Sequence, residues 1–301
     1  MSIWLNIMIL MIFSFTLSAF DTYTEAFSAG RKAEQQKQFA EAVACYRKAE
    51  ALAGNPNERY NSVFRRAEAF QQDRKWDDAR RTLQEISKIS GMNSHQLGTA
   101  LIYVGHYFYW EGNLNEAGKV FEEISKNKKV HLSSRVDALI NLGNILGQQK
   151  NLNRAVVIYE KAASTTDIQP YLQATAYLRM ASVYKKSGEY DKAHKALESA
   201  ENISNLPSTS LSAVIIQRGE LYYTEKKYYE AIEEFNRIFV MDAPLRYHLD
   251  IVDWHLGNIY YHGLKDMDKA KIHYLRARKS PVNWIRKNAS EYLNNRIHIN
   301  Q

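Results

Sequence analysis

Hydrophobic and polar positions recur along this chain with a period near 38 residues. The segments GNLNEAGKVFEEI (112–124), KNLNRAVVIYEKA (150–162) and GEYDKAHKALESA (188–200) share a turn-like pair, an alanine, and further apolar residues three or four positions away. Alignment on the alanine gives seven in-register copies, at Ala42, Ala79, Ala117, Ala155, Ala193, Ala231 and Ala270. Repetition at a fixed period indicates that one structural unit is stacked many times.

Each copy is predicted to form a hairpin of two helices, here called helix A and helix B. Apolar or aromatic residues three positions before and four positions after each alanine give helix B one buried face. Twelve positions before the first six alanines lies a small residue, which lets helix A approach helix B closely. These residues are Gly30, Ala67, Gly105, Gly143, Ala181 and Gly219. In the seventh copy Gly257 is one residue out of step, thirteen positions before Ala270.

Prolines and glycines mark the ends of the expected helices. All five prolines lie between copies and predict where each next helix A begins, because proline is tolerated only in the first turn of a helix. They are Pro56, Pro170, Pro207, Pro244 and Pro281. Gly112 and Gly188 lie at the turn from helix A to helix B, where a left-handed residue ends a helix at low cost. We expect residues 23–298 to form about fifteen helices and no strands.

The repeats resemble the tetratricopeptide repeat (TPR) family. The resemblance is carried by segments such as NLGNILGQQKNLNRAVVIYEKA (141–162) and RGELYYTEKKYYEAIEEFNRIF (218–239). It implies an all-α solenoid of helical hairpins, wound as a right-handed superhelix, with seven repeats over residues 23–283. It also implies that partners lie along a concave face lined by helices A. The family period is about 34 residues, so we expect the longer period here to lengthen the helices between one helix B and the next helix A.

The two ends of the chain differ from the repeats. Residues 3–20, IWLNIMILMIFSFTLSAF, are uncharged and almost wholly apolar, which is typical of a signal peptide covering residues 1–19. The same run could instead remain as an N-terminal membrane anchor. Either outcome exports the rest of the chain, to a periplasmic or extracellular location. Residues 284–301 predict a C-terminal capping helix with Ile285, Ala289 and Tyr292 on its apolar face.

Composition and motifs argue against a catalytic or metal-binding function. The net charge of +7 comes from Lys and Arg interspersed with Asp and Glu, which favours a solvated surface over a nucleic-acid-binding face. The single cysteine, Cys45, excludes an intrachain disulfide and a multi-cysteine metal site. Phosphate-binding glycine loops and the zinc-protease and serine-hydrolase motifs are absent from the sequence. We therefore expect no catalytic residues, no cofactor and no metal, and a protein that is not an enzyme.

Residues of helix A on the side away from helix B are the candidate binding groove. Aromatic residues mixed with Asn and Arg are typical of protein-recognition surfaces. The candidates are Arg65, Tyr103, His106, Tyr109, Trp110, Asn141, Asn144, Arg179, Lys186, Tyr223, Trp254, Asn258 and Tyr261. We expect binding to centre on the aromatic part, around Tyr103 and Tyr109.

The leading functional hypothesis is a scaffold or adaptor of the cell envelope or exterior that binds a protein or peptide segment in this groove. A second hypothesis is an accessory subunit that positions substrate for a separate envelope enzyme. A third is a basic-surface binder of anionic lipid or polysaccharide, because basic residues gather near the C-terminus. These are Lys265, Lys269, Lys271, Arg276, Arg278, Lys279, Arg286 and Lys287. The sequence leaves the oligomeric state open.

Overall fold

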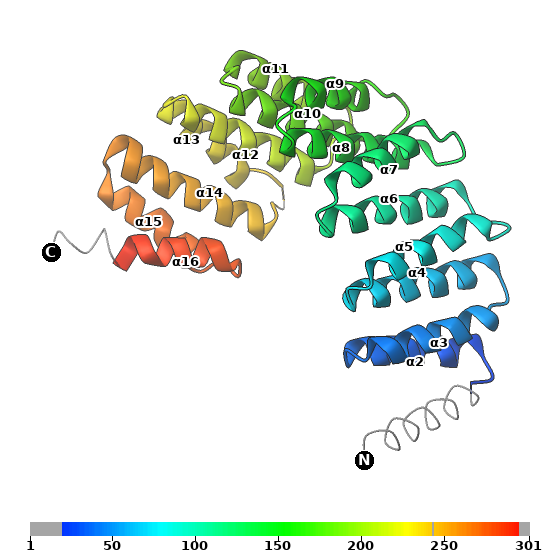
Figure 1. Cartoon of the computed structure of the whole chain (residues 1–301). Coiled ribbons are helices and arrows are strands. Elements are labelled where there is room, and N and C mark those ends of the chain that lie inside the picture. The colour runs from blue at the N-terminus through cyan, green and yellow to red at the C-terminus, as the bar shows by residue number, and fades with distance from the viewer. Residues whose placement is uncertain (1–19, 243, 295–301) are drawn as a thin grey trace. The chain divides into compact units, whose positions relative to one another are not determined.

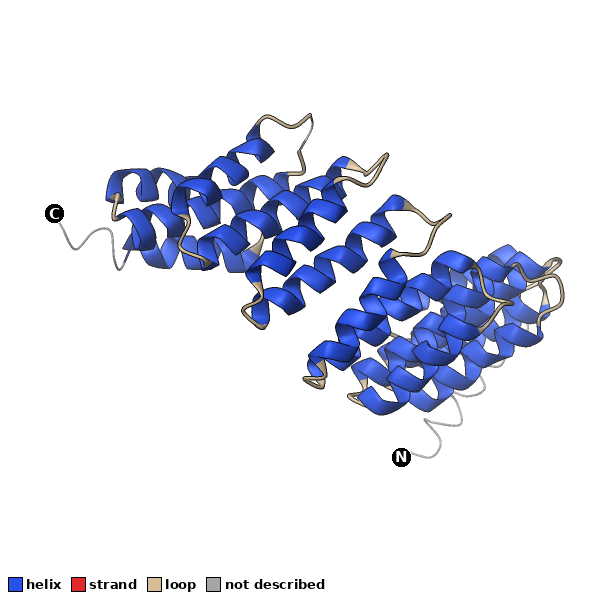
Figure 2. Cartoon of the chain, turned by 90° about the horizontal axis from the view of Figure 1, so that it is seen from above, coloured by secondary structure: helices blue, strands red, loops and turns tan. Residues whose placement is uncertain are grey.

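The structure, a computed structural model, describes residues 20–242 and 244–294. The predicted signal peptide or anchor (1–19) and the last part of the predicted capping helix (295–301) lie outside the described residues. Helices joined by short loops make up the described part of the chain, which contains no strand (Figure 2). The chain divides into two compact units, 1–149 and 150–301.

Unit 1 contains four helices A and three helices B, and consecutive helices pack against each other (Figure 1). The helices A are α2 (Tyr23–Gln35), α4 (Pro56–Gln72), α6 (Ser94–Trp110) and α8 (Leu132–Gln148). The helices B are α3 (Phe39–Ala51), α5 (Trp76–Glu85), which continues as the short 3-10 helix η1 (Ile86–Lys88), and α7 (Leu114–Lys126).

Unit 2 begins with a helix B, continues with three hairpins and ends with a single helix. Its helices A are α10 (Pro170–Lys186), α12 (Ser208–Thr224) and α14 (Arg246–Asn258), the last continued by the π-helix η2 (Ile259–Leu264). Its helices B are α9 (Leu152–Ala163), α11 (Tyr190–Glu201), α13 (Tyr228–Phe239) and α15 (Met267–Ala277). The closing helix is α16 (Asn283–Tyr292). The fifteen α-helices of the described residues confirm the helix count and the all-α class.

The helix starts follow the repeat register. Helices α4, α6, α8, α10 and α12 are each 17 residues long, so the extra residues of the long period do lengthen helix A. Pro56 and Pro170 occupy the first turns of α4 and α10, and Pro207 is the N-cap of α12. Pro244 and Pro281 each lie two residues before a helix. The prolines therefore mark helix starts as predicted.

Close packing within a hairpin depends on a glycine covered by an aromatic ring. A Cβ added to Gly105 would lie 2.6 Å from Cε1 and Cζ of Phe121, and one added to Gly219 would lie 2.7 Å from the same atoms of Phe235. The same contact joins two further pairs: Gly30 with Tyr46, and Gly257 with Tyr274. Copies with alanine at this position have a leucine in place of the ring: Ala67 with Leu83, and Ala181 with Leu197. The small residue and the helix B residue thus vary together.

All seven turns from helix A to helix B contain a residue in the left-handed conformation, two positions before helix B. Gly112 and Gly188 occupy it with φ of 89° and 75°, as predicted. The other five turns place a basic residue there, with φ between 58° and 62°. These are Lys37, Arg74, Lys150, Lys226 and Lys265. A side chain at positive φ is strained, but a positive charge at the C-terminus of a helix interacts favourably with its dipole.

The π-helix explains the irregular spacing of the seventh copy. In η2 the chain closes a wider turn than an α-helix, which adds one residue between Gly257 and α15. The ring of Tyr274 still covers Gly257, because the inserted residue is absorbed before helix B begins. The extra residue in the sequence is therefore a local bulge, and the hairpin contact is kept.

An arginine joins three helices in each unit. Arg66 pairs with Glu50 of α3, at 2.5 Å between Nη1 and Oε2, and with Glu85 of α5. In unit 2 the corresponding residue, Arg218, pairs with Glu201 of α11 at 2.6 Å and Glu234 of α13 at 2.7 Å. Both arginines directly precede the small residue of helix A. Their partners come from the preceding helix B and from the helix B of the same hairpin, so this ion pairing connects successive hairpins.

Candidate functional site

An aromatic cluster lies on α6 of unit 1 and consists of Tyr103, His106, Tyr107 and Trp110. Tyr103 makes edge contacts with His106 and Tyr107, both at 6.1 Å between ring centroids. His106 stacks on Trp110 at 5.5 Å with 16° between the ring planes. Trp110 also contacts Tyr107 at 5.7 Å. Three of the predicted groove residues are therefore brought together, and a fourth ring, Tyr107, joins them.

Trp110 is the most accessible ring of the α6 aromatic cluster. Half of its surface remains exposed, whereas Tyr103 and His106 are half-buried and Tyr107 is fully buried. An exposed indole held by a stacked neighbour offers a large apolar area that loses little rotamer freedom when a partner covers it. The cluster therefore has the physical properties of a binding anchor.

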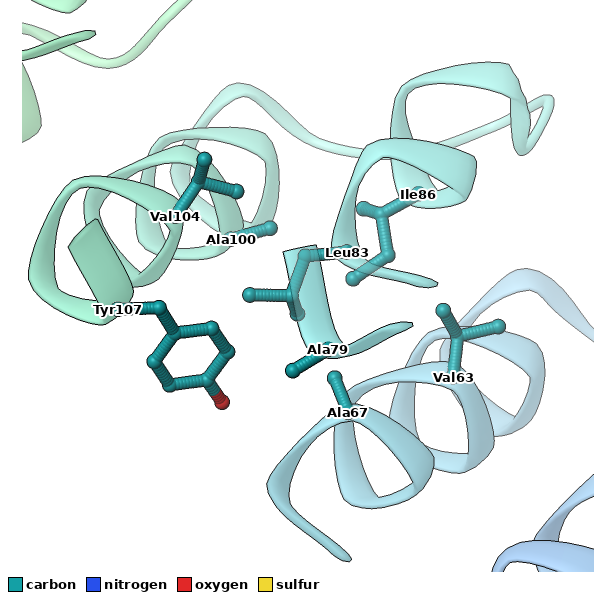
Figure 3. Close-up of a cluster of buried hydrophobic side chains, with 8 residues drawn as sticks. All are labelled: Val63, Ala67, Ala79, Leu83, Ile86, Ala100, Val104 and Tyr107. Carbon is teal, nitrogen blue, oxygen red and sulfur yellow. The ribbon is translucent and has the colours of Figure 1, made fainter. Parts of the chain in front are cut away.

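Tyr107 anchors the cluster in the core of unit 1. Its ring packs with aliphatic side chains of α4, α5 and α6, and Figure 3 shows the hydroxyl at the edge of this group, with only hydrocarbon side chains drawn around it. The hydroxyl has no hydrogen-bond partner among the described residues. An unpaired buried hydroxyl costs about 1–3 kcal/mol, which the burial of the large Tyr107 ring offsets. Tyr107 was not among the predicted groove residues, although its neighbours in YFYW (107–110) are aromatic too.

His106 contacts helix B, contrary to the expectation that it lies on the opposite side. Its ring meets the ring of Phe121 edge-on at 5.4 Å between centroids. The reason is the glycine contact described above: the Phe121 ring lies over Gly105 and therefore reaches the next residue of α6. Burial lowers the pKa of His106, so the imidazole is mainly neutral at pH 7 and stacks on Trp110 without a charge.

The remaining candidates of unit 1 are held by hydrogen bonds between or within helices A. The Tyr109 hydroxyl accepts a hydrogen bond from the Gln148 side chain, which connects α6 to α8. Asn141 donates to the carbonyl oxygen of Asp137 at 3.0 Å and to its carboxylate at 3.2 Å. Asn144 is half-buried on the next turn of α8. The Tyr109 hydroxyl therefore bonds to α8, and its ring is not one of the four that form the α6 aromatic cluster.

Partly buried carboxylates lie on the same helices A of unit 1. Arg65 pairs with Glu68 at 3.0 Å. Burial nevertheless raises the pKa of Glu68, with Arg65 opposing the shift and Glu34 adding to it. Glu34 accepts a hydrogen bond from the Tyr46 hydroxyl. Burial also raises the pKa of Asp137, against the hydrogen bond from Asn141. In both carboxyl groups burial outweighs the contacts that favour the charged form, so ionisation is less favourable than in water.

The helix A residues of unit 2 bond to one another across successive helices. Glu220 of α12 lies 3.1 Å from Nζ of Lys185 (α10) and 3.2 Å from Nε2 of His255 (α14). Burial opposes ionisation of Glu220, but the contacts with His255 and Lys185 outweigh it and lower its pKa. The Gln217 side chain donates to the Leu178 carbonyl oxygen and to the Ser182 hydroxyl, both at 2.8 Å. These polar groups are already satisfied within the unit.

The predicted groove residues of unit 2 do not form one cluster. Arg179 and Lys186 are exposed on α10, and the Tyr223 ring contacts Tyr228 at 5.9 Å. Trp254, Asn258 and Tyr261, in contrast, pack with the last helices. Asn258 accepts a hydrogen bond from the Tyr274 hydroxyl at 2.9 Å, and the rings of Trp254 and Tyr261 contact Tyr274 and Tyr292.

Trp254, Asn258 and Tyr261 were expected on the side of helix A away from helix B. Their contacts with Tyr274, which belongs to the helix B α15, show that this expectation was wrong. The cause is again the aromatic ring over a glycine, here Tyr274 over Gly257. The ring reaches the residues on either side of Gly257, so they contribute to the end of the unit 2 core.

The thiol of Cys45 is unsuited to nucleophilic chemistry. Cys45 is buried in α3, and burial raises the pKa of the thiol to about 11. The thiolate is the reactive form, so this cysteine is almost wholly protonated at neutral pH. No group of three His, Cys, Asp or Glu residues in the described part of the chain is arranged to hold a metal ion. Within the same residues, no helix is both long and apolar enough to cross a membrane.

Comparisons with known proteins agree with the repeat register. Two family models, both described as tetratricopeptide repeat, match residues 135–166 and 174–205. These segments cover the fourth and fifth copies of the sequence pattern. No curated protein sequence matches the chain closely enough to be counted as a relative.

Solved structures of similar fold include three with low sequence identity. A tetratricopeptide repeat protein from Parabacteroides merdae is 16% identical, with a TM-score of 0.56, over 90% of this chain and 99% of that one. The C-terminal part of a TPR repeat-containing protein from Cytophaga hutchinsonii is 17% identical, with a TM-score of 0.51, over 89% and 99%. Human IFIT1, solved as a dimer with PPP-AAAA, is 17% identical, with a TM-score of 0.55, over 85% of this chain and 58% of that one. The chain therefore contains tetratricopeptide repeats, and its fold is an all-helical solenoid of the TPR type.

Proposed function

We propose that this protein is a non-enzymatic scaffold that binds a protein or peptide segment on the helix A face of unit 1. The observation that carries the proposal is the α6 aromatic cluster, with the half-exposed Trp110 stacked on His106. The TPR-type fold supports it, because solenoids of this kind present successive helices as an extended binding surface.

The charges of unit 1 define the chemistry of the partner. Glu34 and Glu68 lie on α2 and α4, and burial raises the pKa of Glu68 despite its pairing with Arg65. A carboxylate beside aromatic rings favours a cationic group, which gains both charge pairing and cation–π attraction. The partner segment therefore carries Lys or Arg residues next to an apolar side chain that covers Trp110.

The test begins with a pull-down that uses the chain from Phe20 onward. The buried residues of the described cores lie between Ala26 and Leu293, so this chain keeps them all. The captured segment is then titrated against the parent and against Trp110→Ala. Loss of one anchor costs about 2 kcal/mol, which is about thirtyfold in affinity.

Trp284→Ala is the matched control, because Trp284 is another exposed indole (44%) and lies in unit 2. It should bind as the parent does, and both variants should keep the parent helix content by circular dichroism. Equal affinity of Trp110→Ala and the parent would refute the assignment to the α6 aromatic cluster.

We also propose that the protein acts in the cell envelope or outside the cell. The support is the apolar run at residues 3–20, followed by a chain whose one cysteine is buried and protonated. Recovery of full-length soluble protein from the cytosol would contradict this location.

A further inference from the structure

Exposed apolar side chains gather at one edge of unit 2, around the connection from α13 to α14. Val240 is 84% exposed, and Leu245 and Tyr247 are exposed by nearly half. Phe239, at the end of α13, is 38% exposed. We call these four residues the apolar rim. Large exposed apolar groups close together are unusual on a soluble surface and mark a contact with something else.

A basic segment lies beside the apolar rim. The buried carboxylate of Asp250 in α14 pairs with Arg246 at 2.8 Å and accepts a hydrogen bond of 2.6 Å from Ser280. Ser280 belongs to the connection between α15 and α16, so this bond holds the connection against the first turns of α14. Figure 1 shows both segments at the same end of unit 2.

The connection between α15 and α16 carries basic side chains that are accessible to an external anion. Arg278 and Lys279 are exposed and form no ion pair with any residue that the structure describes. The connection from α13 to α14 contains one carboxylate, the exposed Asp242, so the two connections together carry two unpaired basic residues and one acidic residue.

We propose that this edge of unit 2 binds the surface of an anionic lipid bilayer. The apolar rim inserts among the headgroups and upper acyl chains, while Arg278 and Lys279 pair with lipid phosphates. Exposed apolar side chains near unpaired basic residues are the combination that interfacial membrane binding requires. The unpaired basic residues beside the apolar rim favour an anionic bilayer, which offers phosphates and acyl chains together, and a protein contact is one outcome of the test below. This inference is independent of the binding proposed for unit 1.

The test is co-sedimentation of the chain from Phe20 onward with two kinds of vesicle. One is pure phosphatidylcholine and the other contains about a third phosphatidylglycerol, at low salt. The parent should sediment with the anionic vesicles at least tenfold better than with neutral ones. The advantage should decline steeply as the salt concentration rises, because the charges become screened.

Two double variants separate the two contributions. Arg278→Gln with Lys279→Gln should weaken binding to anionic vesicles about thirtyfold, the effect of two basic residues at a charged surface. Val240→Asp with Leu245→Asp should weaken it at least as much, because a carboxylate opposes both insertion and charge pairing. All four residues are exposed, so the fold should persist, which circular dichroism checks.

Val157→Asp is the matched control. Val157 is an exposed valine (61%) on α9 of the same unit, away from the rim in the sequence. It should sediment as the parent does. The proposal is overturned if the parent ignores anionic vesicles, binds neutral ones equally well, or loses as much binding from Val157→Asp as from the rim variants. In those cases the apolar rim either contacts another protein or has no binding role.

Discussion

The pairing of a glycine with an aromatic ring predicts a strong coupling between Gly105 and Phe121. In Gly105→Ala the new Cβ would lie 2.6 Å from two ring carbons of Phe121, closer than carbon atoms approach in folded proteins. The substitution raises helix propensity by about 1 kcal/mol, but overpacking costs about 1–3 kcal/mol. Because both groups are buried, relief requires the helices to separate. We expect a net destabilisation of about 1–2 kcal/mol.

A second substitution should rescue the first. Phe121→Leu alone leaves unfilled space over Gly105 and should cost about 1–2 kcal/mol. In the double variant the alanine methyl occupies that space and the leucine avoids the clash, as in the natural pair of Ala67 with Leu83. The double variant should therefore lie within about 1 kcal/mol of the parent. The two changes are then coupled by about 2 kcal/mol, within the usual range for residues in contact.

The assay is urea unfolding of the four proteins, followed by circular dichroism at 222 nm. Gly118→Ala is the control, because the nearest atoms to a Cβ at Gly118 are 3.8 Å away, and this variant should gain up to about 1 kcal/mol. If Gly105→Ala is stabilised like Gly118→Ala, or if the two costs simply add in the double variant, the close-approach argument is wrong.

Three further predictions follow from the turns, the thiol and the N-terminus. Lys226→Gly should raise the free energy of unfolding by about 0.5–1 kcal/mol, because it relieves a side chain at φ 62°, and Gly188→Ala should lower it by about 1 kcal/mol; urea midpoints decide both. Cys45, whose thiol pKa is about 11, should react with a thiol reagent at pH 8 roughly a hundredfold more slowly in the native protein than in denaturant, and equal rates would contradict its burial. N-terminal sequencing of the exported protein should begin near Phe20, whereas an intact Met1 in the membrane fraction would show an anchor.

Much of the fold could be predicted because each repeat has the same pattern of small and apolar positions. An error in one copy is corrected by the others, which is why the register from Ala42 to Ala270 fixed the hairpins and the prolines fixed their starts. The left-handed turns were only partly predicted. Glycine identifies them at Gly112 and Gly188, but a basic residue such as Lys226 gives no such signal, because its backbone strain is offset by charge at the end of the helix.

The candidate site was less predictable because it depends on which neighbour each side chain meets. His106 and Asn258 follow the small residue and were assigned to the open side of helix A. An aromatic ring over that small residue reaches both of them. The sequence contains the cause, since Gly105 and Gly257 both have aromatic partners, but the consequence requires the side-chain positions. The two arginine networks had no periodic signal, because only Arg66 and Arg218 directly precede the small residue of helix A among the described copies.

The contrast between the two helix A faces explains why one repeat architecture can carry a local binding site. In unit 2 the polar groups around Glu220 bond across three successive helices, and a partner would have to replace bonds that already exist. In unit 1 half of the Trp110 indole is exposed, so a partner that covers this ring adds apolar contact without replacing a hydrogen bond or an ion pair. The free energy of binding is what remains after the new contacts have offset the contacts and solvation that the free protein loses. The binding proposed for unit 1 therefore depends on side chains that follow the small residue of helix A, because the hairpin geometry itself is common to both units.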